Sequence, residues 1–223
     1  MVDVVLIVED KNDVFFIRDF ILKNYCDSDI SKVKKIREKE YLVEYNSKII
    51  LIRDTNKESD FSETGGWSKV QGLINSDTLL KLKNLNEKIK FITLFDADED
   101  KSDNISKKET DINFWLKNKN FSIDRFYLPF NNNDSHNLEQ LLELSFNKNI
   151  KECWDIFMNC ILNQQNSDAT QPQSKKGKII IYKDIYSKLK DKKNEYLSEI
   201  WNLDAKSNVH LKTLQTFLDQ YLK

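Results

Sequence analysis

Glycine, proline and histidine are scarce in this chain of 223 residues, which has four Gly, two Pro and two His. Hydrophobic residues make up 39% of the sequence and charged residues 32%. This composition is typical of a globular, soluble protein with a lean towards helix. Neither histidine, His136 or His210, has a cysteine nearby that would support a zinc site, and we interpret His136 as a solvated loop residue.

Cysteine is also scarce, with only Cys26, Cys153 and Cys160, and no CxxC pair occurs. Because the count is odd and no metal-type spacing is present, we interpret all three as small, buried apolar residues in a reducing compartment. Cys153 and Cys160 are seven residues apart, so they would share one face of a helix.

Targeting and membrane signals are absent. The apolar run in the opening MVDVVLIVEDK is too short for a signal peptide and lacks a basic lead. No stretch approaches the about 20 apolar residues of a membrane span, so a cytoplasmic location with no membrane partner is expected. There is no Walker A pattern, so an ATP motor would have to be a separate chain, and no GxSxG nucleophile elbow.

An excess of either charge is lacking too. The 35 Lys and Arg residues nearly cancel the 36 Asp and Glu residues, and the net charge is -1. This balance gives no sign of nucleic-acid binding. It does not exclude it, because a local basic strip beside an acidic metal site leaves the total near zero.

The order of apolar runs predicts an α/β fold with a mostly parallel sheet flanked by helices. Strands are expected over residues 4–8, 49–52, 90–95 and 123–128. Helices are expected between them over residues 11–24, 67–83 and 106–118, with a turn at Gly65-Gly66. Strand signals then stop, and further helices are expected over residues 137–162, 178–190, 194–201 and 208–222. We therefore divide the chain into a metal-binding domain at 1–145 and a helical extension at 146–223, with a mobile polar loop at about 163–177.

Acidic residues follow two of the predicted strands at the point where each ends. Glu9 follows the strand at 4–8, and Asp96 and Asp98 follow the strand at 90–95. Ligands of open α/β sheets sit at the carboxyl ends of the strands, and Asp13 lies about one helical turn after Glu9. Clustered carboxylates repel one another unless a cation is present, and hard oxygen ligands suit Mg²⁺ or Mn²⁺. The pattern predicts a divalent-metal site.

These residues resemble the signature of the topoisomerase–primase (Toprim) fold. The matching segments are Leu6-Ile7-Val8-Glu9 with Asp13, and Leu94-Phe95-Asp96-Ala97-Asp98, within roughly residues 1 to 130. The chain looks most like stand-alone bacterial Toprim-like proteins and the nuclease domain of the overcoming-lysogenisation-defect family. It departs from the family pattern at Asp10, where a glycine is usual, which puts the tightness of that turn in doubt.

The resemblance implies a Mg²⁺- or Mn²⁺-dependent nuclease that hydrolyses nucleic-acid phosphodiesters, with DNA favoured over RNA. It also implies a role in phage defence, with a separate ATPase chain as a candidate partner. The C-terminal helices could cap the sheet, contact substrate or pair with a second copy of the chain in a homodimer. The implied roles are a metal ligand or general base for Glu9, metal ligands for Asp96 and Asp98, a ligand or a residue behind the ligands for Asp13, a second-metal ligand for Glu139, and neutralisation of phosphate charge for Lys178 or its neighbours Lys175 and Lys176.

Simpler interpretations exist for single residues. Glu9-Asp10 could cap a helix, and the acids from Asp98 onwards could form a solvated loop. Glu139 could be a first-turn acid favoured by the helix dipole, and Lys178 an ordinary surface lysine.

Two other functions stay open at this point. The opening strand also resembles that of a phospho-receiver domain, with Asp54 in the place of the phosphoacceptor. Asp98 counts against this alternative, because a receiver has Ser or Thr at the corresponding strand and a Lys-Pro pair later. The other alternative is a Toprim-like module that binds a partner without catalysis.

Overall fold

The computed structural model describes residues 1–56, 66–98, 104–132, 137–163, 175–186 and 195–223. Its strands are β1 (Val4–Val8), β2 (Val33–Arg37), β3 (Glu40–Tyr45), β4 (Lys48–Asp54), β5 (Lys90–Asp96) and β6 (Ile123–Leu128). Its helices are α1 (Lys11–Tyr25), α2 (Trp67–Asn75), α3 (Asp77–Leu85), α4 (Ile105–Leu116), α5 (Leu138–Glu143), α6 (Lys148–Asn163), α7 (Lys175–Tyr186) and α8 (Lys212–Leu222). Short 3-10 turns occupy Ile30–Lys32, Glu195–Leu197 and Val209–Leu211.

The six strands form one sheet in the order β2-β3-β4-β1-β5-β6. β1 lies in the middle and pairs in parallel with β4 and β5, and β6 continues the parallel pairing beyond β5. All five residues of β1 are buried, as expected of a strand covered on both faces. The prediction of a mostly parallel α/β sheet flanked by helices is confirmed.

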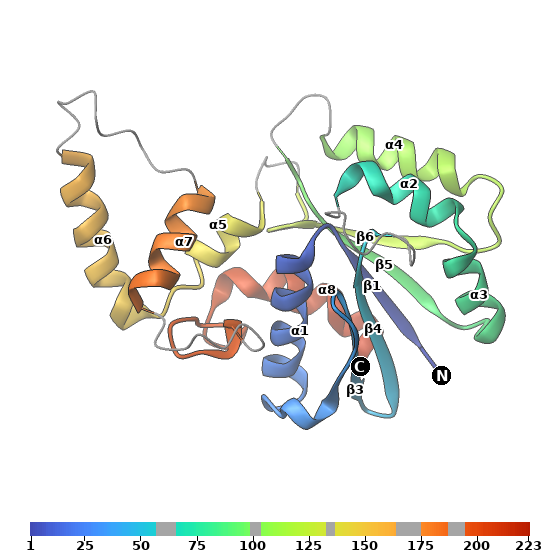
Figure 1. Cartoon of the computed structure of the whole chain (residues 1–223), viewed down its shortest axis with the longest axis horizontal. Helices are drawn as coiled ribbons and strands as arrows, with labels where there is room; N and C mark the ends of the chain where they lie inside the picture. Colours follow the sequence, from blue (N-terminus) through green and yellow to red (C-terminus); the bar gives the residue numbers. More distant parts are fainter. Residues whose placement is uncertain (57–65, 99–103, 133–136, 164–174, 187–194) are drawn as a thin grey trace.

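Helices cover both faces of the sheet, and successive residues of β1 point to opposite layers. Leu6 packs in the core shared with α1 and the later helices, whereas Ile7 packs in the core under α2, α3 and α4. Figure 1 shows these two layers, with α1 and α8 on one side of the sheet and α2 to α4 on the other. The ring of Phe217 on α8 lies 5.1 Å from that of Phe126 on β6, so the helices after β6 share a core with the sheet.

The segment between α1 and β4 contains a hairpin that the sequence analysis missed. β2 and β3 pair antiparallel with each other, and β3 continues onto β4. The side chains of Lys34, Lys35 and Ile36 are exposed, so β2 lacks the apolar alternation that marks a half-buried strand. Charged residues of this kind are common on edge strands, where they discourage pairing with other chains.

Two long helices predicted from the sequence are each broken. The helix expected at 67–83 divides at Ser76, whose side chain caps α3 by accepting from the Thr78 amide. The helix expected at 137–162 divides into α5 and α6, because Phe146 leaves the helix to form a bridge with Trp201. The helix expected at 194–201 is only the 3-10 turn Glu195–Leu197.

The expected loop at 163–177 ends earlier than predicted, because α7 already begins at Lys175. Residues 164–174, Gly65, His136 and the end of the helix expected at 178–190 lie outside the described residues. No helix among the described residues has the length and apolar character needed to cross a bilayer.

The prediction that all three cysteines are buried is wrong for two of them. Cys26 is buried, but Cys153 and Cys160 are exposed. The buried face of α6 carries Trp154 and Met158 instead, so the shared face of the two cysteines points away from the core.

A buried ion pair ties α1 to the chain before α8. Asp19 Oδ1 lies 2.7 Å from the Arg18 guanidinium, and Asp19 Oδ2 accepts from the Tyr196 amide at 3.0 Å. Both charged side chains are almost completely buried, and the Arg18 guanidinium also lies over the rings of Phe15 and Tyr41.

The Asp19→Asn variant is expected to lose about 3 kcal/mol of unfolding free energy, because it leaves a buried guanidinium beside a neutral side chain. Urea unfolding monitored by circular dichroism measures the loss. The matched control is Asp155→Asn, which breaks an exposed pair with Lys151 and is expected to cost less than about 0.5 kcal/mol. Equal losses in the two variants would contradict the structural role of Asp19.

Candidate functional site

The carboxyl ends of β1 and β5 bring two predicted site residues together. The strands pair in parallel with Val8 opposite Leu94. Glu9 follows Val8 directly, and its Oε1 accepts a hydrogen bond from the backbone amide of Asp96 at 3.2 Å. The two acids therefore meet at one edge of the sheet, as the strand-end pattern predicted.

Asp13 is fixed by the first turn of α1. The Asp10 side chain accepts from the amides of Asn12 and Asp13, and Asp13 Oδ2 accepts in return from the Asp10 amide at 3.0 Å. This reciprocal capping box satisfies amides that the helix leaves without partners. Asp10 has an extended backbone with φ of -136°, so this turn does not need the glycine usual in the Toprim family.

Glu139 enters the site from the first turn of α5. The side chain of Asn137 caps this helix by accepting from Gln140, and the amide of Leu138 donates to Asp96 Oδ1 at 2.8 Å. The last bond attaches the start of α5 to the end of β5. It places Glu139 beside Asp96 although 43 residues separate them in the sequence.

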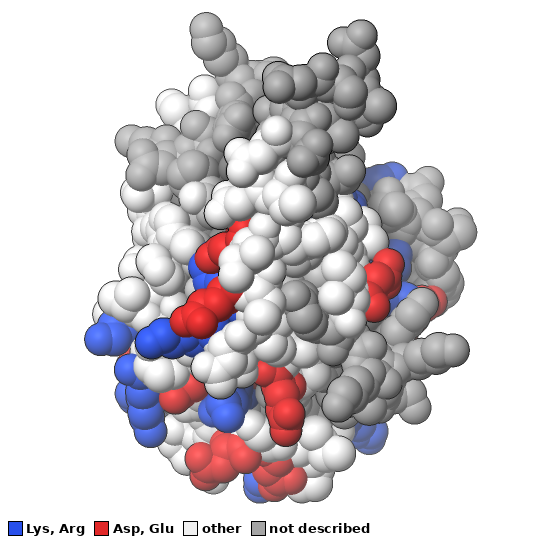
Figure 2. Space-filling model, turned by 90° about the vertical axis from the view of Figure 1, so that its left-hand side faces the viewer, with Lys and Arg blue, Asp and Glu red and all other residues white. Residues whose placement is uncertain are grey.

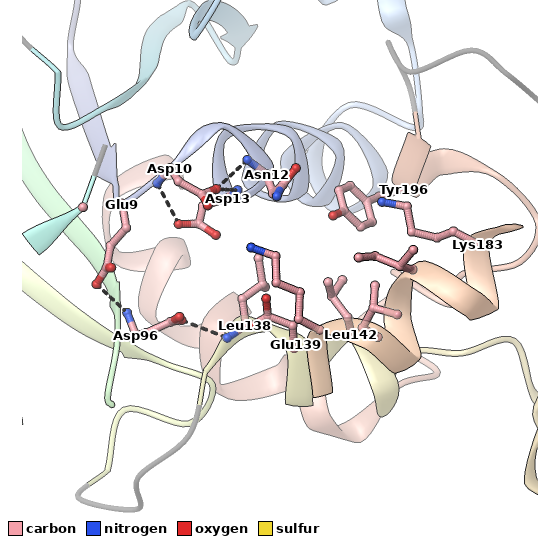
Figure 3. Close-up of a pocket in the computed structure, with 14 residues that line it drawn as sticks. Glu9, Asp10, Asn12, Asp13, Asp96, Leu138, Glu139, Leu142, Lys183 and Tyr196 are labelled. Carbon is pink, nitrogen blue, oxygen red and sulfur yellow. Dashed lines mark hydrogen bonds between the residues drawn. The ribbon is translucent and has the colours of Figure 1, made fainter. Parts of the chain in front are cut away.

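These acids open onto a common cavity of about 530 Å³. Figure 3 shows Glu9, Asp13, Asp96 and Glu139 around one central space. The cavity is lined by Glu9, Asp10, Asn12, Asp13, Gly66, Asp96, Leu138, Glu139, Leu142, Lys176, Ile179, Ile180, Lys183 and Tyr196.

The far wall of the cavity comes from α7. Lys176 and Lys183 line it and are seven residues apart, so they share a face of the helix with Ile179 and Ile180 between them. Lys178 does not line the cavity, and its Nζ lies 3.6 Å from Glu143 Oε1. Lys176 was a candidate from the sequence and Lys183 was not, because the helix was expected to begin at 178, which left Lys176 outside it; α7 begins at Lys175.

Aromatic packing holds α7 in this position. The ring of Tyr182 stacks on that of Phe146, with centroids 3.5 Å apart. It contacts the ring of Trp154 edge-on and that of Trp201 at a tilt. Its hydroxyl donates to the Ile200 carbonyl at 2.6 Å. One face of α7 is thereby anchored, and the face with the two lysines is left towards the acids.

Asp98 lies differently from the other predicted ligands. Its backbone has φ of +48°, a left-handed conformation that Asp tolerates better than most residues. Its carboxylate contacts Lys108 of α4, with Oδ2 2.6 Å from Nζ, and it is not among the residues that line the cavity. Lys108 was not predicted as a site residue.

Burial and mutual repulsion raise the pKa values of three acids of the cavity. Burial raises the pKa of Glu9 to about 7, with Lys108 opposing the shift and Asp98 adding to it. Burial, followed by repulsion from Glu9, raises the pKa of Asp96 well above its usual range. Burial and the neighbouring carboxylates Asp10, Asp96 and Glu9 do the same for Asp13.

A divalent cation fits the chemistry of these donors. No three His, Cys, Asp or Glu side chains within the described ranges stand as a ready metal-binding group, so the fit rests on donor type and charge. Hydrogen bonds from described residues occupy one oxygen each of Glu9, Asp13 and Asp96. Carboxylate oxygens are the ligands of Mg²⁺ and Mn²⁺. A cation would relieve the mutual repulsion that adds to burial in raising these pKa values.

The remaining candidates lie away from the cavity. Asp54 is buried and accepts from both the backbone amide and the side chain of Asn56, which leaves a phosphoacceptor little access to a phosphodonor. Trp67 and Trp115 are partly buried and pack on each other and against the core under α2 to α4.

Comparisons with models of protein families, with curated proteins and with solved structures find no match to this chain.

In the presence of a chelator, the unfolding free energy is expected to fall as pH rises from about 5 to 7. The folded pKa of Glu9 is about 7, above its ordinary value of 4.5, so the folded state binds more protons in this window and loses stability as they dissociate. The Gln side chain in the Glu9→Gln variant stays neutral. The fall in its unfolding free energy between about pH 5 and 7 should therefore be smaller than that of wild type by roughly 1–3 kcal/mol. Urea unfolding at a series of pH values measures both slopes.

Glu143→Gln, which alters a carboxylate outside the cavity, is the control and should keep the wild-type slope. Equal slopes in wild type and Glu9→Gln would contradict the raised pKa.

Proposed function

We propose that the chain is a Mg²⁺- or Mn²⁺-dependent nuclease that hydrolyses nucleic-acid phosphodiesters. The observation that carries this proposal is the cavity itself. Carboxylates at the ends of β1 and β5 and on the first turns of α1 and α5 line it together with Lys176 and Lys183 of α7. Acids that can hold a cation, in one cavity with ammonium groups that can bind phosphate, make an arrangement suited to phosphoryl chemistry.

The acids and the lysines that line the cavity have different roles in this proposal. Glu9 and Asp96, with Asp13 and Glu139 beside them, would hold the cation, which when bound polarises a phosphoryl oxygen and activates water. Lys176 would bind the substrate phosphate and offset the negative charge that builds up on it. Lys176 takes the role that the resemblance assigned to Lys178, because it is Lys176 that lines the cavity.

The substrate is argued from the resemblance and from the cavity. The Toprim-like motifs support nucleic acid, and DNA before RNA. The cavity volume of about 530 Å³ is that of a small-molecule site, which favours entry of a short piece of a single strand. On the described surface seen in Figure 2, Lys and Arg lie next to Asp and Glu, so we expect binding to be governed by the cavity.

The resemblance alone supports the proposed biological setting, an effector in phage defence that works with an ATPase on a separate chain. A cytoplasmic location and self-association into a dimer are separate proposals that the resemblance does not carry.

Purified protein is expected to cut DNA with Mg²⁺ or Mn²⁺ and to be inactive with EDTA. Glu9→Gln and Asp96→Asn should lower the cleavage rate on the order of 10⁴-fold, because each removes a charged oxygen ligand from the cavity. Supercoiled, linear and single-stranded DNA and RNA, resolved on gels, serve as parallel substrates.

Glu139→Gln and Glu143→Gln form a matched pair on α5. Only the first residue lines the cavity, so only the first variant should lose activity. Cleavage that survives Glu9→Gln and Asp96→Asn would overturn the proposed function.

A second pair of variants tests the proposed binding of the substrate phosphate by Lys176. Lys176→Ala should lower the cleavage rate by about 100-fold and reduce by about 1 the slope of log affinity against log salt for a single-stranded oligonucleotide. Lys178→Ala should change neither, because its ammonium faces Glu143 outside the cavity. Fluorescence anisotropy gives the affinities, and the reverse ranking of the two variants would contradict the assignment of Lys176.

A further inference from the structure

A completely buried lysine lies behind the acidic edge of the cavity. The side chain of Lys108 on α4 has 0% exposure. Its Nζ lies 2.6 Å from Asp98 Oδ2, 2.7 Å from the backbone carbonyl oxygen of Asp96 and 3.6 Å from Glu9 Oε1. Lysine is almost never fully buried unless its charge is paired, and here three oxygens from two strand ends surround the ammonium.

The surroundings of Lys108 keep the ammonium in this position. The ring of Trp67 lies over it at 5.5 Å, and Trp67 packs in turn on Phe95 and Trp115. The side chain of Asn104 caps the start of α4, one turn before Lys108. The stem of the lysine is held by this packing, and its charged end reaches the oxygens at the sheet edge.

The position of Asp98 is the consequence. Asp96 and Glu9 line the cavity, but Asp98 does not, although Asp96 and Asp98 form the DxD pair that predicted two metal ligands. The Asp98 carboxylate is neutralised by a cation that belongs to the protein.

We propose that Lys108 is a built-in cation that takes the place of one metal ion. The site then holds a single Mg²⁺ or Mn²⁺ on the cavity side of Glu9 and Asp96, and Asp98 is a positioning residue that anchors Lys108. An ammonium 3.6 Å from Glu9 repels any second cation at this edge. The inference rests on the proposed metal-dependent function and specifies how many ions its site takes.

The number of bound Mn²⁺ ions tests the proposal without any reference to activity. Calorimetric titration of the full chain, with free Mn²⁺ followed by electron paramagnetic resonance, should give one tight site per wild-type chain. Asp98→Asn should keep this site with an affinity within about 3-fold of wild type, whereas Asp96→Asn should weaken it by about 10- to 100-fold or more. Two tight sites in wild type, or equal losses in the two variants, would overturn the proposal.

Substitution of the lysine gives the complementary result. Lys108→Met removes the ammonium and frees Asp98, so a second Mn²⁺ should bind. Lys108→Arg keeps the charge and should stay at one ion, as should Lys107→Met, which changes the exposed neighbour on α4. If Lys108→Met fails to fold, as judged by circular dichroism, the comparison of Asp98→Asn with Asp96→Asn decides alone.

Cleavage assays on the same samples separate this inference from the proposed function. If the chain binds one Mn²⁺, keeps it in Asp98→Asn and loses affinity in Asp96→Asn, but cuts no nucleic acid, the nuclease assignment is wrong and the role of Lys108 stands. If the chain is a nuclease that binds two Mn²⁺ ions and loses one of them in Asp98→Asn, the nuclease assignment stands and the role of Lys108 is wrong. A wild-type chain that binds no Mn²⁺ overturns both.

Discussion

The parallel pairing of β1 with β5 is the constraint on which the site depends. Because the two strands pair in parallel, both end at the same edge of the sheet, and Glu9 and Asp96 lie next to each other there. Two partly buried carboxylates in such proximity repel each other, and hydrogen-bond donors and an ammonium group surround them. The Asp96 amide donates to Glu9, the Leu138 amide donates to Asp96, and the ammonium of Lys108 lies behind both. The start of α5 and the position of α4 both follow from these bonds.

The opposite wall depends on packing. The stack of Tyr182 on Phe146 and the hydrogen bond from its hydroxyl to Ile200 hold α7. Lys176 and Lys183 face the acids because Tyr182 is turned into the core. In the proposed function, the two walls divide the work between an acidic edge set by strand pairing and a basic wall set by aromatic contacts.

Local patterns in the sequence were sufficient to predict the central strands, α1 and the acids at the strand ends. A continuous apolar run predicts a buried strand, and an acid directly after it must lie at the sheet edge. The hairpin of β2 and β3 was missed because an edge strand with exposed lysines carries no apolar alternation. The breaks at Ser76 and Phe146 were missed because they depend on a cap and on a distant partner, Trp201.

Lys108 and Lys183 are two charged residues of the site that escaped prediction. Lys107 and Lys108 are adjacent and alike in sequence, yet one is exposed and the other completely buried. Only the packing of α4 against Trp67 and the sheet edge distinguishes them. Lys176 and Lys178 were both candidates, and the phase of α7 decides which of them reaches the cavity.

The backbone amide of Tyr196 donates a hydrogen bond to the carboxylate of Asp19 on α1, and Tyr196 also lines the cavity. The same helix carries Asp13 on its first turn, so α1 ties the segment around Tyr196 to the acidic edge. A ribosome makes the chain from its N-terminus, so Glu9 and Asp96 are synthesised well before residues 176–196. Until those residues follow, the nascent chain carries the acids of the cavity without the lysines of α7.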